Sequence, residues 1–280
     1  GCSDAGICTF HGLKADNEKS KLLNTFRAGV NNGKGDNEIN IWSTYFEYYR
    51  DLSKEFGAGV RFNYLSESGS SLDNSGFSDI FINIDYSPVP EVDIVAGVKI
   101  PLNDANKKFD SLDVGLPMGY QTSLGTFDLL LGIGYTYKGL KLGAGYQQPL
   151  NQNKNTYLST DFPPGAPFGQ FQSTNQFERS ADLMLRAAYE IPVTKQFFIT
   201  PGLLPIFHLG NDKYTDSSGT VVEIDGSSGV TLNANLILEY RINPNNAVVF
   251  GGSAPLVTRD SRPDGMGRKY LFNLDYKIMF

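Results

Sequence analysis

The sequence predicts an all-β fold: a transmembrane antiparallel barrel of about twelve strands. Two observations lead to this prediction. Segments that alternate apolar and polar residues recur from about residue 22 onward, and the connections between them are alternately short and long. A barrel with tight turns at one rim and long loops at the other requires that alternation, whereas a soluble β-sandwich does not. No run of residues approaches the roughly 18 apolar residues of a membrane helix, so a membrane-spanning chain of this composition must be a barrel.

The last eleven residues form the clearest strand. Apolar or aromatic side chains occupy every second position from Tyr270 to Phe280, and the segment ends on an aromatic residue. A strand of this kind has one lipid-like face. The pattern resembles the carboxy-terminal strand by which bacterial outer-membrane barrels are recognised for insertion.

The same period of two identifies the other strands. In the segment 56–64, for example, Val60 and Phe62 share one face while Arg61 lies on the other. Strong alternation predicts strands at 56–64, 78–86, 92–100, 127–137, 140–146, 181–191, 230–240 and 270–280, and weaker alternation predicts strands at 23–30, 39–50, 197–209 and 247–254. Pro201 and Pro205 each remove a backbone donor, so the strand 197–209 is expected to be irregular.

The connections define the orientation of the predicted barrel. Short turns are predicted at 51–55, 87–91, 138–139, 192–196 and 243–246, and long loops at 31–38, 65–77, 102–125, 148–178, 210–229 and 255–268. Outer-membrane barrels place short turns in the periplasm and long loops outside. Both termini are therefore expected to be periplasmic.

The net charge and the cysteines indicate which partners and which cellular compartment the protein has. A formal net charge of -6 and a pI near 5.0 argue against a nucleic-acid partner. We take Gly1 as the start of a mature chain from which an export signal has been removed. A disulfide between Cys2 and Cys8, the only cysteines, is expected in an oxidising periplasm. A lipidated Cys2 and two free thiols are the alternatives.

The chain divides into an N-terminal periplasmic segment, residues 1–21, and the barrel, residues 22–280. The first segment shows no alternation and either folds into the lumen as a plug, with Phe10 and His11 contacting inward residues such as Arg61 or Arg186, or stays unstructured in the periplasm.

Inward polar residues are the candidate lining of a pathway, because about twelve strands enclose only a narrow lumen. Because side chains alternate between the two faces of a strand, the polar residues expected to face inward are Arg27, Arg61, Lys99, Asp182, Arg186, Asn233, Asn235 and Glu239. The alternative is that these groups neutralise one another in a plugged interior, because buried charges need partners.

Enzymatic and metal-dependent functions are not expected. The chain has two histidines, and His208 is followed by Leu209 and Gly210 rather than by the serine pattern of outer-membrane hydrolases. Asp212 lies beyond it in a loop, so a rim or lumen histidine is the better interpretation. No metal-ligand spacing is present, and no cofactor is expected.

Two stretches, Gly76 to Tyr86 and Gly97 to Asp104, resemble the outer-membrane channel family of meta-pathway phenol-degradation proteins, distant relatives of the long-chain fatty-acid transporters. In that family a Gly-x-x-Asp opens an inward-running strand, and the next strand ends in Gly-x-Lys-x-Pro; Ser78 stands where a second glycine is common. The resemblance implies a channel or transporter in the outer membrane of a Gram-negative-type envelope, with membrane lipid and a small hydrophobic or aromatic solute as partners. The alternative is a structural or partner-binding subunit that contacts another envelope protein.

Overall fold

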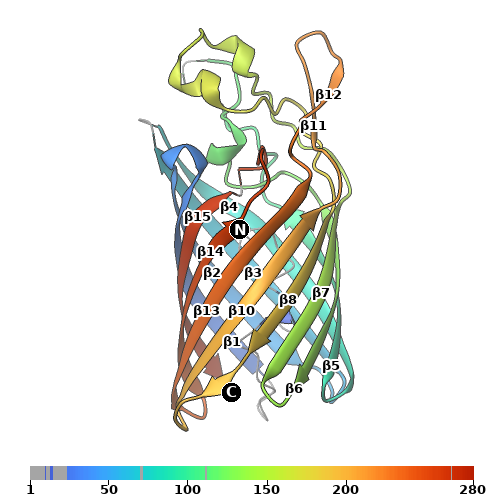
Figure 1. Cartoon of the computed structure of the whole chain (residues 1–280), viewed down its shortest axis with the longest axis vertical. Helices are drawn as coiled ribbons and strands as arrows, with labels where there is room; N and C mark the ends of the chain where they lie inside the picture. Colours follow the sequence, from blue (N-terminus) through green and yellow to red (C-terminus); the bar gives the residue numbers. More distant parts are fainter. Residues whose placement is uncertain (1–9, 11–12, 15–23, 70–71, 111, 266) are drawn as a thin grey trace.

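The computed structural model shows a closed barrel of twelve antiparallel strands (Figure 1). It describes residues 10, 13–14, 24–69, 72–110, 112–265 and 267–280. The wall is formed in order by β1 (Asn24–Gly35), β2 (Asn40–Asp51), β3 (Phe56–Gly69), β4 (Leu72–Val89), β5 (Val92–Pro101), β6 (Asp128–Tyr137), β7 (Leu140–Pro149), β8 (Asp182–Tyr189) with its short extension β9 (Ile191–Pro192), β10 (Phe197–His208), β13 (Gly229–Asn243), β14 (Asn246–Val257) and β15 (Arg268–Met279). Pairing of β1 with β15 closes the ring. The predicted fold class is confirmed.

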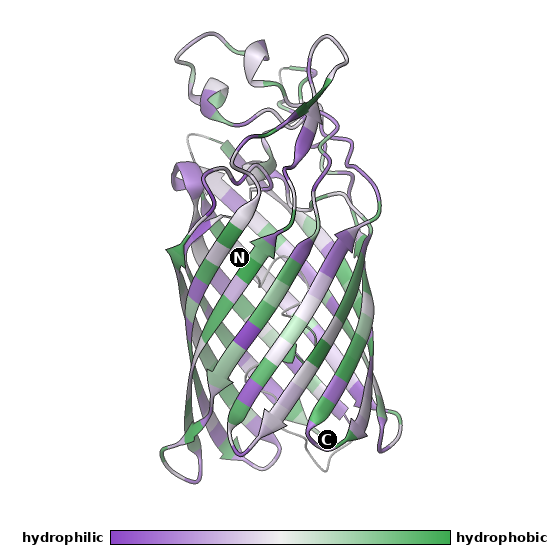
Figure 2. Ribbon diagram, turned by 45° about the vertical axis from the view of Figure 1, so that its right-hand side comes forward, coloured by the Kyte–Doolittle hydropathy of each residue, from purple (hydrophilic) through white to green (hydrophobic). Residues whose placement is uncertain are grey.

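The alternation predicted from the sequence separates the two faces of the wall. Along β2, for example, Ile41 and Tyr45 are buried inside the barrel, while Trp42 and Phe46 are exposed on the outside. Large apolar side chains are exposed on strands around the whole barrel and form an apolar band, and Figure 2 shows hydrophobic and hydrophilic residues alternating along the strands. A band of this kind contacts hydrocarbon in a membrane barrel. Among the described residues, no helix has the length and apolarity to cross a bilayer.

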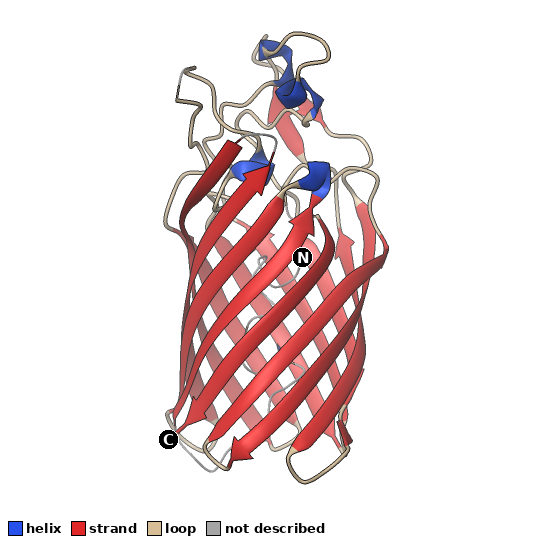
Figure 3. Cartoon of the chain, turned by 90° about the vertical axis from the view of Figure 1, so that its left-hand side faces the viewer, coloured by secondary structure: helices blue, strands red, loops and turns tan. Residues whose placement is uncertain are grey.

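The turns at one end are short, as predicted. At the turn between β6 and β7, Lys138 has a φ of 46° and Gly139 a φ of 86°, the pair of positive values that a two-residue hairpin turn requires. We call this end, where Phe280 lies, the short-turn end. The opposite end is the long-loop end (Figure 3).

Two of the predicted long loops are wrong. The segments 31–38 and 65–77 belong mainly to strands: β1 continues to Gly35, and β3 and β4 pair as far as Gly69 and Leu72. The reason is that these hairpins extend past the apolar band, where both faces of a strand are polar and the alternation disappears.

The remaining long loops pack on one another above the barrel. They contain the short helices η4 (Met118–Tyr120), η5 (Ser159–Asp161) and η6 (Pro167–Gln170), and the hairpin β11 (Lys213–Thr215) and β12 (Val221–Glu223); the β1–β2 turn contains η3 (Asp36–Glu38). One apolar cluster joins Leu116 and Tyr120 to Phe109, Phe168 and Phe171, and a second joins Met118 and Leu124 to Phe177 and Ile224. The long-loop end is thereby a packed cap.

The two prolines of β10 interrupt the wall at one place. The ladder between β10 and β13 runs without a gap, so the ring nitrogens of Pro201 and Pro205 face β8. On that side the register is continuous, but pairing is missing at residues 200–201 and 204–205. We call this interrupted pairing of β8 and β9 with β10 the β8–β10 seam. The irregularity predicted for this strand is confirmed.

Candidate functional site: the interior of the barrel

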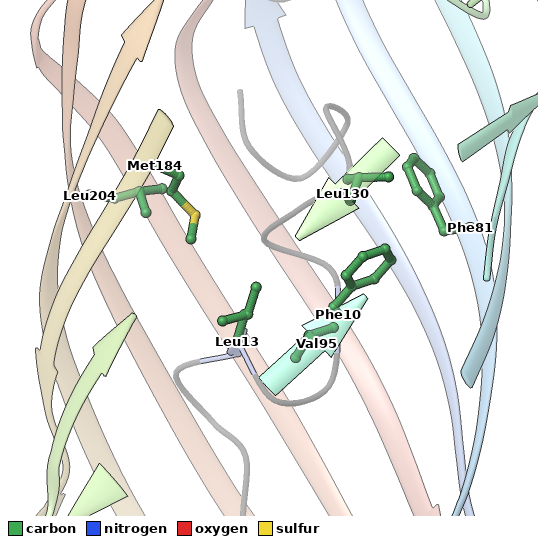
Figure 4. Close-up of a cluster of buried hydrophobic side chains, with 7 residues drawn as sticks. All are labelled: Phe10, Leu13, Phe81, Val95, Leu130, Met184 and Leu204. Atoms are coloured by element: carbon green, nitrogen blue, oxygen red, sulfur yellow. The ribbon is translucent and has the colours of Figure 1, made fainter. Parts of the chain in front are cut away.

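One side of the barrel interior is apolar. Five inward side chains, one each from β4, β5, β6, β8 and β10, belong to one apolar cluster and are almost wholly buried: Phe81, Val95, Leu130, Met184 and Leu204. Figure 4 shows them gathered inside the barrel with Phe10 and Leu13 of the N-terminal segment. We call these five residues the apolar wall. The sequence analysis missed it because parity placed these residues on the polar face; an apolar residue such as Val95 between Asp93 and Gly97 was the available signal.

Glycines make room for the two residues that cover the apolar wall. A Cβ atom built on Gly97 would lie 2.5 Å from Cζ of Phe10, and one built on Gly132 would lie 2.5 Å from Cδ1 of Leu13. Any side chain at either position would therefore collide with the N-terminal segment. The wall has recesses that match these two side chains.

Polar contacts hold the same segment from two sides. Lys14 donates to the carboxylate of Glu47 on β2, and the Arg186 guanidinium on β8 donates to the carbonyl of Leu13. Arg186 thus contacts the segment through Leu13 rather than through Phe10 or His11, and Phe10 lines a small cavity together with Arg61. His11, Cys2 and Cys8 lie outside the described residues, so the predicted contact of His11 and the predicted disulfide stay predictions.

The opposite side of the interior is charged and paired. Arg27 contacts Asp275 at 3.1 Å, and Lys277 and Arg241 contact Glu239 at 3.1 and 2.7 Å. The Arg61 guanidinium lies 3.6 Å from Glu47 and 3.5 Å from the centroid of the Tyr45 ring. These ion pairs join β1 to β15, β15 to β13, and β3 to β2, so the charges compensate within the wall.

Another ion pair, between β5 and the start of β6, is fully enclosed. The Lys99 ammonium lies 3.1 Å from the Asp128 carboxylate and donates to the Thr126 hydroxyl at 3.0 Å, and both charged side chains are 0% exposed. Gln147 also donates to Asp128. Such a pair is stable only while every partner is present.

The predicted inward residues all face the interior or its mouth. Of the eight, Arg27, Arg61, Lys99, Asp182 and Glu239 are buried in ion pairs, Arg186 holds Leu13, and Asn233 and Asn235 are half-buried on β13. They are not one continuous lining. Asp182 belongs to a separate cluster at the long-loop end.

That cluster surrounds His208, the last residue of β10. Its Nδ1 lies 2.6 Å from Asp182 and its Nε2 lies 2.7 Å from Asp212. Both ring nitrogens are held by carboxylates and the side chain is 1% exposed, so no nitrogen is free to act as a catalytic base. The sequence analysis missed the contact with Asp182, because only the pairing of β8 with β10 brings these residues together.

Two arginines complete the cluster and attach the loops to the barrel. Arg179 contacts Asp182 and lies 3.5 Å from Asp264, while Arg259 lies 3.1 Å from the same carboxylate. Burial alone would lower the pKa of Arg179, but the carboxylates of Asp182 and Asp264 hold the pKa of this guanidinium above its usual range. Within the part of the chain that the structure describes, no three His, Cys, Asp or Glu side chains are grouped to hold a metal ion.

Comparison with known proteins places this geometry among membrane barrels. No family model and no curated protein matches the chain. The structure is similar to that of a COG4313 outer membrane channel from Pseudomonas putida F1, with a TM-score of 0.62 and 14% identity over 95% of this chain and 99% of that chain. The chain has the fold of a bacterial outer-membrane channel. The predicted location in a bacterial outer membrane is confirmed with it.

Two further barrels share the fold at lower similarity. The translocator domain of the autotransporter NalP from Neisseria meningitidis has a TM-score of 0.54 and 9% identity, over 95% of this chain and 91% of that chain. The NanC porin has a TM-score of 0.51 and 9% identity, over 92% of this chain and 100% of that chain. At these identities the comparison establishes the fold of the channel and leaves its solute to the chemistry of its interior.

Proposed function

We propose that this barrel passes small hydrophobic or aromatic molecules across the outer membrane. The observation that carries the proposal is the apolar wall inside the barrel, covered by Phe10 and Leu13. A lumen for ions or sugars has no use for five buried apolar side chains, whereas an apolar solute is stabilised there by about 25 cal/mol per Å² of surface removed from water. The resemblance of residues 76–104 to the phenol-degradation channels supports the same class of solute.

The orientation follows the rule for barrels of this kind. The short-turn end, where β1 begins beside Phe280, faces the periplasm, and the long-loop end faces the outside. In this proposal residues 1–21 serve as the plug of the lumen, and residues 22–280 form the barrel. Support comes from Phe10, Leu13 and Lys14, which contact opposite sides of the interior.

The β8–β10 seam is the proposed exit for the solute. Met184 and Leu204 of the apolar wall lie on the two strands that border it. Each proline removes one ladder hydrogen bond, worth about 0.5–1.5 kcal/mol, so this is where the wall separates at least cost. A solute on the apolar wall would then leave sideways into the bilayer.

The experiment that tests the function measures uptake of a neutral aromatic dye by proteoliposomes. The wild-type barrel is expected to accelerate uptake over protein-free vesicles. The variant Pro201→Ala/Pro205→Ala restores both backbone donors, and we expect it to lower the rate of dye uptake by about fivefold or more. It should also raise the temperature at which the folded, faster-migrating form disappears from gels. Pro255→Ala on β14, away from the seam, serves as the matched control.

The outcomes separate the parts of this proposal. No acceleration by the wild type, even after residues 1–20 are deleted, would favour the partner-binding role, which the filled and charge-compensated interior also fits. Acceleration that is equal in the wild type and the proline variant would leave the channel function and remove the lateral exit.

The cysteines provide a separate test of the plug. If Cys2 and Cys8 form a disulfide, the bond lowers the conformational entropy of the segment before the first strand. This stabilises its ordered form by up to about a few kcal/mol. Cys2→Ser with Cys8→Ser is then expected to raise leak of small solutes without unfolding the barrel, because the strand ladder is untouched. Liposome swelling measures the leak. Unchanged swelling, with the bond demonstrated in the wild type, would make the segment a tether.

A further inference from the structure

The long-loop end contains a cavity that the proposed channel function does not use. It has a volume of about 320 Å³ and lies between four segments: the β1–β2 turn, residues 117–119 at the start of η4, residues 170–172 at the end of η6, and residues 260–265. These are the loops that cover the barrel in Figure 3. A cavity of this size holds a molecule of about one or two rings.

The walls of the cavity are fixed by contacts behind them. The Ser261 N–H donates to the Gly226 carbonyl at 2.9 Å, and Arg268 donates to the Gly265 carbonyl at 2.7 Å. Gly265 has a φ of 68°, and a Cβ there would lie 2.6 Å from the carbonyl oxygen of Met118. The segment therefore packs closely against η4, and these contacts hold the backbone of the cavity wall in place.

The lining is rich in side chains that donate or accept hydrogen bonds. Arg262 donates to the carboxylate of Asp36, which fixes both planar groups in the wall. The remaining polar residues of the lining are Asn37, Gln170, Gln172, Asp260 and Ser261. Amides, a hydroxyl, carboxylates and a guanidinium together offer donors and acceptors to the same occupant.

An aromatic ring and aliphatic groups complete the lining. Phe171 lines the cavity and is held by Tyr120 and Phe168, with ring centroids 5.8 and 6.3 Å away. Ile39 and Met118 lie on the same surface and are buried. The site thus combines a fixed ring face with planar polar groups.

We propose that this cavity binds a neutral saccharide of one or two rings. Sugar hydroxyls both donate and accept, so they match a wall of carboxylates, amides and a guanidinium, and the C–H face of a pyranose packs on an aromatic ring. An anion would meet two carboxylates for one guanidinium, and an ammonium ion would meet Arg262. The neighbouring lysines, Lys34 and Lys269, are paired with Glu38 and do not change this balance. A purely apolar solute would leave the polar groups without partners.

The test is titration of the purified full-length barrel in detergent with maltose and with glucose, by calorimetry and by saturation-transfer NMR. Saturable binding is expected in the wild type. Phe171→Ala and Asp260→Ala are each expected to weaken it at least fivefold, while Val221→Ala, an exposed change on the β11–β12 hairpin, leaves it unchanged. Heat-modifiable migration on gels, which does not depend on the proposed channel function, serves as a folding control for every variant.

Further binding measurements identify the source and the charge of the ligand. Competition by purified lipopolysaccharide would assign the sugar to the surrounding lipid surface, and its absence would assign it to a free saccharide; both support the site. Absence of saturable binding by either sugar would overturn the proposal. Wild-type affinity for the sugars in both the Phe171→Ala and the Asp260→Ala variant would also overturn it. So would binding of glucosamine or glucuronate that is tenfold tighter than binding of glucose.

Discussion

Replacing Asp128 with alanine is expected to lower the free energy of unfolding of the barrel by about 3–5 kcal/mol. The reason is the complete burial of its partner: Lys99 is 0% exposed, and its ammonium lies 3.1 Å from Asp128. Removing the carboxylate leaves a buried cation that neither water nor a neighbouring acid compensates in full. Urea-induced unfolding in lipid vesicles, followed by intrinsic fluorescence, measures the change.

The chain offers a matched control for this experiment. Lys108 and Asp113 form a second lysine–aspartate pair, but on an external loop where the Asp113 side chain is 93% exposed. The variant Asp113→Ala is expected to unfold at the same urea concentration as the wild type, because water replaces the lost contact. Equal midpoints for both variants would show that water reaches Lys99, which would make that part of the interior an open path.

Replacing Phe10 and Leu13 together with serine is expected to raise solute permeation through the barrel by tenfold or more. The two side chains are 2% and 3% exposed and lie on the apolar wall. Burial of each stabilises the segment in the lumen by about 1.5–3 kcal/mol, and every 1.4 kcal/mol changes the populations tenfold. Single-channel conductance and dye uptake both measure the effect.

A surface change of the same kind is the control for the plug. Leu112→Ser lies on an external loop at 49% exposure and is expected to leave permeation unchanged. If the Phe10 and Leu13 variant folds, as judged by heat-modifiable migration on gels, and permeation also stays unchanged, the segment does not limit passage. The apolar wall would then be a structural packing surface.

The strands were predictable from sequence because the bilayer and the interior impose opposite polarities on neighbouring residues. Segments such as 230–240 alternate without interruption, and Gly139 suits one of the two positive φ angles of its turn. The extensions of β1 and β3 beyond the bilayer were not predictable, because polar residues on both faces carry no period.

The candidate site was predictable only in part. Parity placed Arg61 and Arg186 inside, and their contacts with Glu47 and with Leu13 agree with that placement. The apolar wall depends on residues from five strands and on two residues that precede the barrel, so its members are adjacent only after the ring closes. The partners of His208 likewise depend on strand pairing rather than on spacing along the chain.

The two prolines of β10 have a consequence for which molecules the barrel selects. A pore that runs from end to end sorts molecules by diameter, because the narrowest ring of side chains sets the limit. If the β8–β10 seam is the exit, as proposed above, the barrel sorts molecules by solubility instead, because the rate then depends on how readily a molecule leaves the apolar wall for lipid. Among solutes of equal mass, transport should therefore follow the oil–water partition coefficient.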